Sequence, residues 1–111
     1  NQLEERNLIK EAKRKGEILF KKLNELKNRY PKRVSYILGK GLIAAILLKN
    51  PIDGEPDALF ASKVAERCMQ KGLLVVHTGR ESIKLGPPLC ITDEALIEGV
   101  DVISESIKEL N

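Results

Sequence analysis

The side chains of this chain that could do covalent or acid–base chemistry are few and lie apart in the sequence. Cys68 is a candidate nucleophile and His77, the only histidine, is a candidate base, but no motif ties one to the other. Cys68 falls in the apolar stripe of a predicted helix, where a small buried thiol is the common role. A single histidine beside a turn is more often a hydrogen-bonded surface residue than a catalyst. We therefore predict no catalytic residue from this pair.

Two basic residues, Arg80 and Lys84, lie beside and within a short predicted strand. Residues 82–85 read Ser-Ile-Lys-Leu, and this alternation predicts a strand that presents Ser82 and Lys84 on one face. Arg80 lies in the loop before this strand. From the residues alone, Lys84 is an exposed lysine on an edge strand.

A glycine-rich turn and two cysteines complete the candidates. Residues 39–41 read Gly-Lys-Gly, which could cradle phosphate through backbone amides, but they lack the fuller nucleotide-binding pattern and lead into a strand. We interpret them as a turn. Cys68 and Cys90 are too few and too far apart for a disulfide framework or a metal motif, so we predict no metal site. Two reduced thiols are typical of the cytoplasm, which is the location that we expect.

The elements that position these residues are organised around residues 82–96. A glycine and two prolines at 86–88 end the predicted strand and hold the next residues extended, and Thr92 can then cap a helix with two acids in its first turn. The other elements follow from hydrophobic periodicity and turn residues: helices at 3–29 and 57–71, and strands at 34–38, 42–48 and 73–76. The final helix spans about 93–110. This order predicts an α+β fold, with a small, mostly antiparallel sheet of three to four strands covered on one face by helices, and a long N-terminal helix.

The predicted core comes from apolar stripes at helical spacing. In the first helix the stripe is Ile9, Ala12, Gly16, Leu19, Leu23, Leu26 and Tyr30. In the second helix it is Leu59, Phe60, Val64, Cys68 and Met69. In the last helix it is Leu96, Val100, Ile103, Ile107 and Leu110. The strands at 42–48 and 73–76 are apolar on both faces, so we expect the second face of the sheet to dock on another part of the protein.

Composition places the chain among small domains without a membrane segment. It has 111 residues, 42% of them hydrophobic, and no apolar run approaches the roughly 20 residues that span a bilayer. The net charge of +3 is uneven, because residues 1–33 hold 11 Lys or Arg against 5 Glu, while residues 34–111 hold 8 against 11 acids. A basic helix could contact an acidic partner or nucleic acid as a stand-alone binding module. The helix lacks interleaved aromatic residues, so a solvated helix face without nucleic acid is the prediction we favour.

Several segments, taken in order, carry a resemblance to a known family. Residues 83–96 read Ile-Lys-Leu-Gly-Pro-Pro-Leu-Cys-Ile-Thr-Asp-Glu-Ala-Leu, followed by the amphipathic helix that ends the chain. Before them come a leading helix through Gly16, the turn at 39–42 into an apolar strand, a helix opening with Pro-Asp-Ala at 56–58, and Lys-Gly-Leu-Leu-Val at 71–75. This ordered set resembles the C-terminus of the class III pyridoxal-phosphate aminotransferases, the group that includes ornithine and gamma-aminobutyrate transaminases.

The resemblance implies that residues 1–111 are one domain, the C-terminal small domain of a larger enzyme that moves an amino group from an amine or amino acid to a keto acid. Pyridoxal phosphate and the catalytic residues would then be held by a large domain N-terminal to Asn1, and this piece would be inactive alone. The family usually works as homodimers. Lys84 falls where many members have an arginine that pairs with a substrate carboxylate, so the resemblance implies that Lys84 contributes to substrate binding. Lysine keeps the positive charge but cannot make the bidentate pair, and Arg80 in the preceding loop could compensate if it points the same way. The exposed edge-strand position is the alternative for Lys84, and the sequence leaves both interpretations open.

Overall fold

The computed structural model describes residues 2–73, 75–77, 79–88 and 90–111, with side chains from residue 7 onward. Within these ranges the chain forms three helices and one antiparallel sheet of four strands. In chain order the elements are α1 (Gln2–Arg29), β1 (Val34–Lys40), β2 (Ile43–Leu48), α2 (Ala58–Gln70), β3 (Val76–His77), β4 (Ser82–Leu85) and α3 (Asp93–Leu110). This order confirms the predicted α+β class and the long N-terminal helix.

The strands are ordered β1-β2-β4-β3 across the sheet, and each neighbouring pair is antiparallel. β1 and β2 form a hairpin in which Val34 lies opposite Leu48 and Lys40 lies opposite Ile43. The turn uses Gly41 with a φ of 61°, a left-handed conformation that glycine adopts without steric cost. α2 then leads to the edge strand β3, and a short turn brings β4 into the sheet beside β2.

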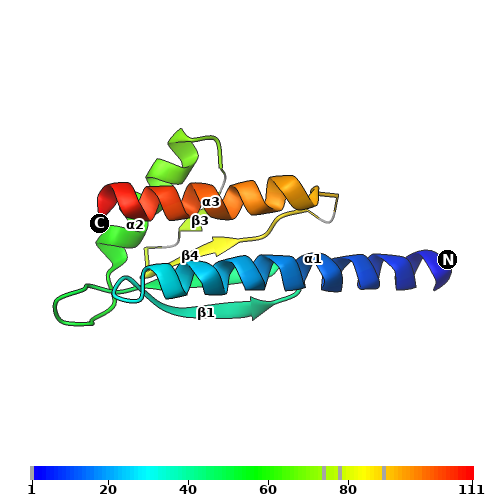
Figure 1. The fold of residues 1–111 in the computed structure, drawn as a ribbon, viewed down its shortest axis with the longest axis horizontal. Coiled ribbons are helices and arrows are strands. Elements are labelled where there is room, and N and C mark those ends of the chain that lie inside the picture. The colour runs from blue at the N-terminus through cyan, green and yellow to red at the C-terminus, as the bar shows by residue number, and fades with distance from the viewer. Residues whose placement is uncertain (1, 74, 78, 89) are drawn as a thin grey trace.

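The helices cover one face of the sheet (Figure 1). α1 packs over β1 and β2, α2 packs over β2, β3 and β4, and α3 packs against both helices. The side chains that they enclose form one hydrophobic core, whose largest fully buried members include Leu19, Leu23, Ile46, Leu48, Ile83, Ile103 and Ile107. None of the helices in the described ranges has an apolar stretch long enough to cross a membrane.

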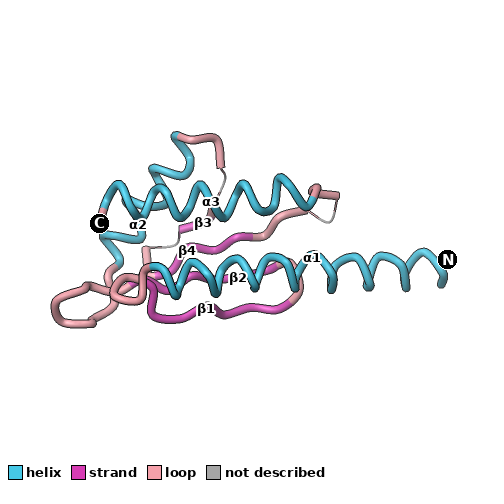
Figure 2. The backbone as a smooth tube through the Cα atoms, in the orientation of Figure 1, coloured by secondary structure: helices cyan, strands magenta, loops and turns pink. Residues whose placement is uncertain are grey.

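The first part of α1 extends beyond the rest of the described chain, as Figures 1 and 2 show. Leu19, Leu23 and Leu26 of the predicted stripe are buried, but Ile9 is exposed. The prediction that the whole stripe packs in the core is therefore wrong at Ile9. The spacing identified the apolar side of the helix correctly, but the described elements do not reach far enough along it to cover this turn.

α2 buries one narrow stripe: Phe60, Ala61, Val64, Ala65 and Cys68. The predicted stripe also included Leu59 and Met69, and this part is wrong, because the two side chains are 67% and 57% exposed. Each lies one position from a buried residue, and one position along a helix turns a side chain by about 100°.

The third strand is shorter than predicted and begins later. The sequence predicts a strand at 73–76, but β3 spans only Val76–His77, and Leu74 lies outside the described residues. The amide of Leu73 donates to the carbonyl of Cys68 at 2.9 Å, so Leu73 belongs to the turn that ends α2. Gly72 in this turn has a φ of 88°, the left-handed conformation in which glycine commonly ends a helix.

Capping side chains fix where α2 and α3 begin, and the cap of α3, Thr92, is the predicted one. A carboxylate oxygen of Asp57 accepts a hydrogen bond from the amide of Phe60 at 3.0 Å, and the hydroxyl of Thr92 accepts one from the amide of Ala95 at 3.1 Å. A guanidinium nitrogen of Arg14 on α1 lies 2.8 Å from a carboxylate oxygen of Asp93 in the first turn of α3. This ion pair joins the start of α3 to the first helix.

Candidate functional site

The face of the sheet that the helices leave uncovered carries an apolar surface. Side chains alternate between the two faces of a strand, so the neighbours of the buried Ile46 and Ile83 point away from the helices. Four large side chains there are strongly exposed: Tyr36 (61%), Leu38 (52%), Ile43 (69%) and Val76 (54%). The register assigns to this surface, which we call the open sheet face, the residues Tyr36, Leu38, Lys40, Ile43, Ala45, Leu47, Val76, Ser82 and Lys84.

Lys84 lies in the middle of the open sheet face. The register places Ala45 of β2 on one side of it and Val76 of β3 on the other, and Leu38 of β1 continues the row beyond Ala45. Lys84 is exposed, and within the described part of the chain no carboxylate pairs with its amine. β4 is an interior strand, so the edge-strand part of the alternative for Lys84 is wrong, whereas the exposed position that it predicted is the one that the structure shows.

Neither Arg80 nor His77 shares the row of Lys84 on the open sheet face. Arg80 is exposed in the turn between β3 and β4, where its carbonyl accepts a hydrogen bond from Nε2 of His77 at 2.8 Å. His77 lies opposite Ile83 and lines a groove with Glu66 and Met69 of α2, so it points to the helix side of the sheet. Lys84 and His77 therefore cannot act at one site on the same face of this sheet.

The two thiols have different environments. Cys68 is fully buried, with its sulfur 3.6 Å from the hydroxyl oxygen of Ser106. Burial raises the pKa of the Cys68 thiol, which disfavours the reactive thiolate. These contacts confirm the prediction that Cys68 is a core residue. Cys90 is exposed near the start of α3.

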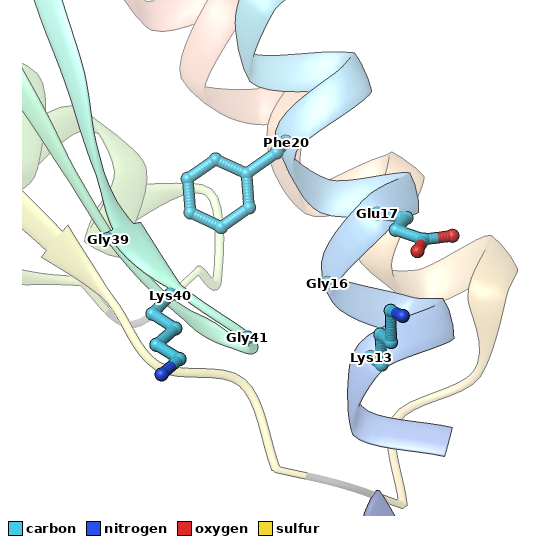
Figure 3. A pocket seen from close by; sticks show the side chains of 7 residues that line it. All are labelled: Lys13, Gly16, Glu17, Phe20, Gly39, Lys40 and Gly41. Atoms are coloured by element: carbon cyan, nitrogen blue, oxygen red, sulfur yellow. The ribbon is translucent and has the colours of Figure 1, made fainter. Parts of the chain in front are cut away.

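The Gly-Lys-Gly segment forms the end of the hairpin and faces α1 across a shallow hollow (Figure 3). Phe20 points from α1 toward the hairpin, whereas Glu17 points away from it and the amines of Lys13 and Lys40 lie on different sides of the hollow. An anion cradle needs donors that converge on one point. The arrangement of these side chains supports the interpretation of residues 39–41 as a turn.

Comparison with known proteins assigns the chain to a family. The family model described as "Aminotransferase class-III" matches residues 1–107, which is nearly the whole chain. A fold of helices on one face of an antiparallel sheet agrees with this match, because a solved transaminase from the marine bacterium Virgibacillus has the same fold. That structure is 30% identical, with a TM-score of 0.83 over 97% of this chain and 26% of its own length. The chain belongs to the class-III aminotransferase family, whose members use pyridoxal phosphate.

Curated relatives of two activities match the chain over nearly its full length. Mitochondrial acetylornithine aminotransferase from Debaryomyces hansenii is 31% identical over 111 residues, all of this chain and 22% of the relative. Leucine/methionine racemase from Thermococcus litoralis is 31% identical over 110 residues, 98% of this chain and 25% of the relative. The chain thus spans about a quarter of the length of these relatives.

The described residues do not form a site that fits pyridoxal phosphate. The cofactor needs an amine for its aldehyde, an acid for its ring nitrogen and a cradle for its phosphate, all in one cavity. Lys84 has apolar neighbours on both adjoining strands, and the hairpin hollow holds Lys13, Glu17 and Lys40 with side chains that do not converge. We therefore derive no reaction step from this chain's residues toward the cofactor.

Ala45 and Val76, which lie opposite Lys84 on the two neighbouring strands, are residues that sequence analysis did not single out. Which residues flank Lys84 depends on the pairing register, and the register is set by long-range strand contacts. The sequence did carry one signal for the open sheet face: residues 42–48 are apolar at every position. A strand that is apolar throughout is typical of a sheet that is covered on both faces.

Proposed function

We propose that the chain is the C-terminal small domain of a pyridoxal-phosphate-dependent aminotransferase, which moves an amino group from an amine or amino acid to a keto acid. Membership of the class-III family supports the reaction type, and the quarter-length match to relatives supports a role as one part of a longer polypeptide. In this proposal the open sheet face packs against the rest of that polypeptide, which holds the cofactor and the catalytic residues.

The single observation that carries the proposal is the lysine in the middle of an apolar sheet face. When the open sheet face is covered, the amine of Lys84 loses its contact with solvent water. A desolvated ammonium group is stable only when an anion pairs with it. An amino acid or keto acid brings a carboxylate. We therefore assign Lys84 to binding the substrate carboxylate, with the exposed Arg80 in the turn before β4 as a second cation for the same carboxylate.

Substitution of Lys84 in the complete protein tests this role. Lys84→Ala should raise the KM for the amino acid about tenfold, because a charge-assisted hydrogen bond is lost, while the visible absorbance of the bound cofactor stays unchanged. Lys84→Arg should retain binding, since a guanidinium can pair with both carboxylate oxygens. Lys63→Ala, which removes an exposed lysine from α2, is the matched control. Unchanged kinetics in Lys84→Ala would remove Lys84 from the substrate site.

The 111-residue chain alone should be inactive. Mixed with pyridoxal phosphate, it should show no absorbance band of a specifically bound cofactor, whereas the complete protein should show one that responds to an amino donor. We also propose that the complete protein is a homodimer, which sedimentation can measure. A fragment that catalyses transamination without any further polypeptide would overturn the division of roles.

Amino-acid racemisation is a second candidate function. The observation that favours it is the racemase from Thermococcus litoralis, which matches 98% of this chain as closely as the aminotransferase does. The two reactions differ in product: transamination consumes a keto acid and releases another, whereas racemisation inverts one amino acid without an acceptor. Incubation of the complete protein with an L-amino acid, with and without a keto acid, separates them by chiral chromatography.

The alternative of a stand-alone binding module with a basic helix gains no support. On α1, Arg14 is engaged by Glu11 and Asp93, and Lys22 lies 3.4 Å from Glu25, so acids interrupt the basic surface. Binding to a nucleic acid would be lost steeply as salt rises, so flow-through of the chain from a polyanion column at low salt would exclude this alternative.

A further inference from the structure

We infer that the surroundings of Lys84 select substrates that carry one carboxylate and an aliphatic side chain, rather than dicarboxylates. This inference rests on the proposed function, in which the rest of the polypeptide packs over the open sheet face and Lys84 binds the substrate carboxylate, so that the residues around Lys84 form one wall of the substrate pocket. It adds a substrate class and names Val76 and Ala45 as specificity-determining residues beside the carboxylate-binding Lys84.

Lys84 stands in a row of side chains that runs across the sheet, between Val76 and Ala45. Residues that lie directly opposite on neighbouring strands have Cβ atoms about 4.5–5.5 Å apart, so Ala45 and Val76 lie within reach of any ligand held by the Lys84 amine. Val76 is 54% exposed, and Ala45 is too small to fill the space above its own position. A ligand bound at Lys84 therefore rests on Val76 and in the space above Ala45.

The rows of side chains on either side of the Lys84 row are mainly apolar. On β2, Ile43 and Leu47 come two positions before and after Ala45 and share its face. Ile43 is strongly exposed and Leu47 is half-buried. Among the described residues next to Lys84 on this face, Ser82 is the only polar one. A ligand group that leaves the Lys84 amine in most directions thus meets apolar side chains, which favour an alkyl group and disfavour a second charge.

A second lysine on the open sheet face, Lys40, lies at the end of the hairpin. Lys40 is on β1 and lies opposite Ile43 of β2. It is two strands away from Lys84 and two residues along the strand from its row, which corresponds to about 12 Å between the Cα atoms of the two lysines. Ile43 stands between the two positions. A dicarboxylate held by Lys84 would have to extend across this isoleucine to reach Lys40, so the arrangement favours a single carboxylate.

Substrate comparison in the complete protein tests the inference. The wild type should have a higher kcat/KM for leucine than for glutamate. Val76→Thr keeps the shape and suits a strand, but replaces a methyl group with a hydroxyl, so it should lower kcat/KM for leucine roughly fivefold to tenfold and leave glutamate almost unchanged. Leu59→Thr, at an exposed leucine of α2 outside the open sheet face, is the matched control and should change neither value.

Inhibition gives a second measurement that needs no variant. Isocaproate has one carboxylate and a branched alkyl chain, whereas glutarate has a carboxylate at each end. Isocaproate should inhibit the wild-type protein more strongly than glutarate, and Lys84→Ala should weaken its inhibition more than Lys40→Ala does. Stronger inhibition by glutarate, with a loss in Lys40→Ala, would show that the two lysines hold a dicarboxylate and would overturn the inference.

The outcomes separate this inference from the proposed function. A protein that acts on amino acids but prefers glutamate, or in which Val76→Thr affects both substrates equally, retains the proposed function and overturns the substrate class. A protein that neither transaminates nor racemises any amino acid overturns both. If Lys84→Ala lowers the melting temperature and leaves KM and inhibition unchanged, Lys84 pairs with an acid of the covering polypeptide, and the inference falls.

Discussion

The two thiols of the chain should react at very different rates. Cys68 is buried beside Ser106 and the pKa of its thiol is raised by burial, whereas Cys90 is exposed. Because the thiolate is the reactive form, a chromogenic disulfide reagent should modify one thiol quickly and the other only on unfolding. Cys90→Ser should remove the fast reaction and Cys68→Ala should retain it. Two fast thiols in the native chain would contradict the burial of Cys68.

The ion pairs of Lys71 should make stability depend on acid pH. The amine of Lys71 on α2 lies 2.6 Å from a carboxylate oxygen of Glu109 and 3.3 Å from one of Glu105 on α3. The hydrogen bond from Lys71 lowers the pKa of Glu109 below its ordinary value. A carboxyl whose pKa is lowered by folding stabilises the fold above its unfolded pKa, about 4.3 for glutamate, and this stabilisation is lost as the pH falls through the folded pKa.

Lys71→Met should therefore lower the free energy of unfolding at neutral pH and flatten its decline between about pH 5 and pH 3. The effect should be small, because the carboxylates are largely exposed and salt screens them. Urea unfolding at several pH values measures it, with Lys63→Met, which removes an exposed lysine of the same helix, as the control. Equal acid slopes in the two variants would show that the contacts of Lys71 contribute nothing to stability.

At the scale of elements, the contact between α1 and the β1–β2 hairpin depends on a missing side chain. A Cβ atom added to Gly16 would lie 2.5 Å from the backbone oxygen of Gly41, so the hairpin would have to move away. In Gly16→Ala, overpacking should cost about 1–3 kcal/mol of the free energy of unfolding, and helix propensity should return about 1 kcal/mol. We therefore expect a net loss of up to about 2 kcal/mol.

Gly99 on α3 is the matched control for this prediction. A Cβ atom added there would lie 3.4 Å from Cδ1 of Leu73, the end of a flexible side chain that can adjust. Gly99→Ala should therefore be neutral, or stabilising by up to about 1 kcal/mol. Urea unfolding of the two variants compares the sites directly. Similar effects of the same sign at both glycines would show that helix propensity, not the approach of the hairpin, governs Gly16.

Helices and strands could be predicted where the sequence signal lies within the segment. Which of their side chains are buried could not be predicted where this depends on packing against distant elements. Periodicity and capping residues located α1, α2 and α3, and alternation located β4, because these signals lie within each segment. The exposure of Ile9, Leu59 and Met69 depends on which other elements reach them. The late start of β3 depends on the turn that ends α2. The neighbours of Lys84 depend on strand register, which no local signal specifies.

At the scale of the whole molecule, the two faces of the sheet differ in how they are covered. One face is filled by α1 and α2, with α3 packed on both, while the other exposes Tyr36, Leu38, Ile43 and Val76. A small monomeric domain seldom exposes an apolar surface of this kind to water. Together with a match to only about a quarter of the length of its relatives, this asymmetry supports a covering polypeptide in the complete protein.

Labelling of single cysteines tests whether the open sheet face is covered. In a Cys90→Ser background, Leu38→Cys places a thiol on the open sheet face and Leu59→Cys places one on the outer side of α2, at positions that are 52% and 67% exposed. Both should react quickly in the 111-residue chain. In the complete protein, the thiol at position 38 should react several-fold more slowly because the rest of the polypeptide covers it, while the thiol at position 59 should keep its rate. Equal rates at position 38 in the two proteins would mean that the open sheet face stays in water, and the substrate wall proposed around Lys84 would then lack the polypeptide needed to enclose it.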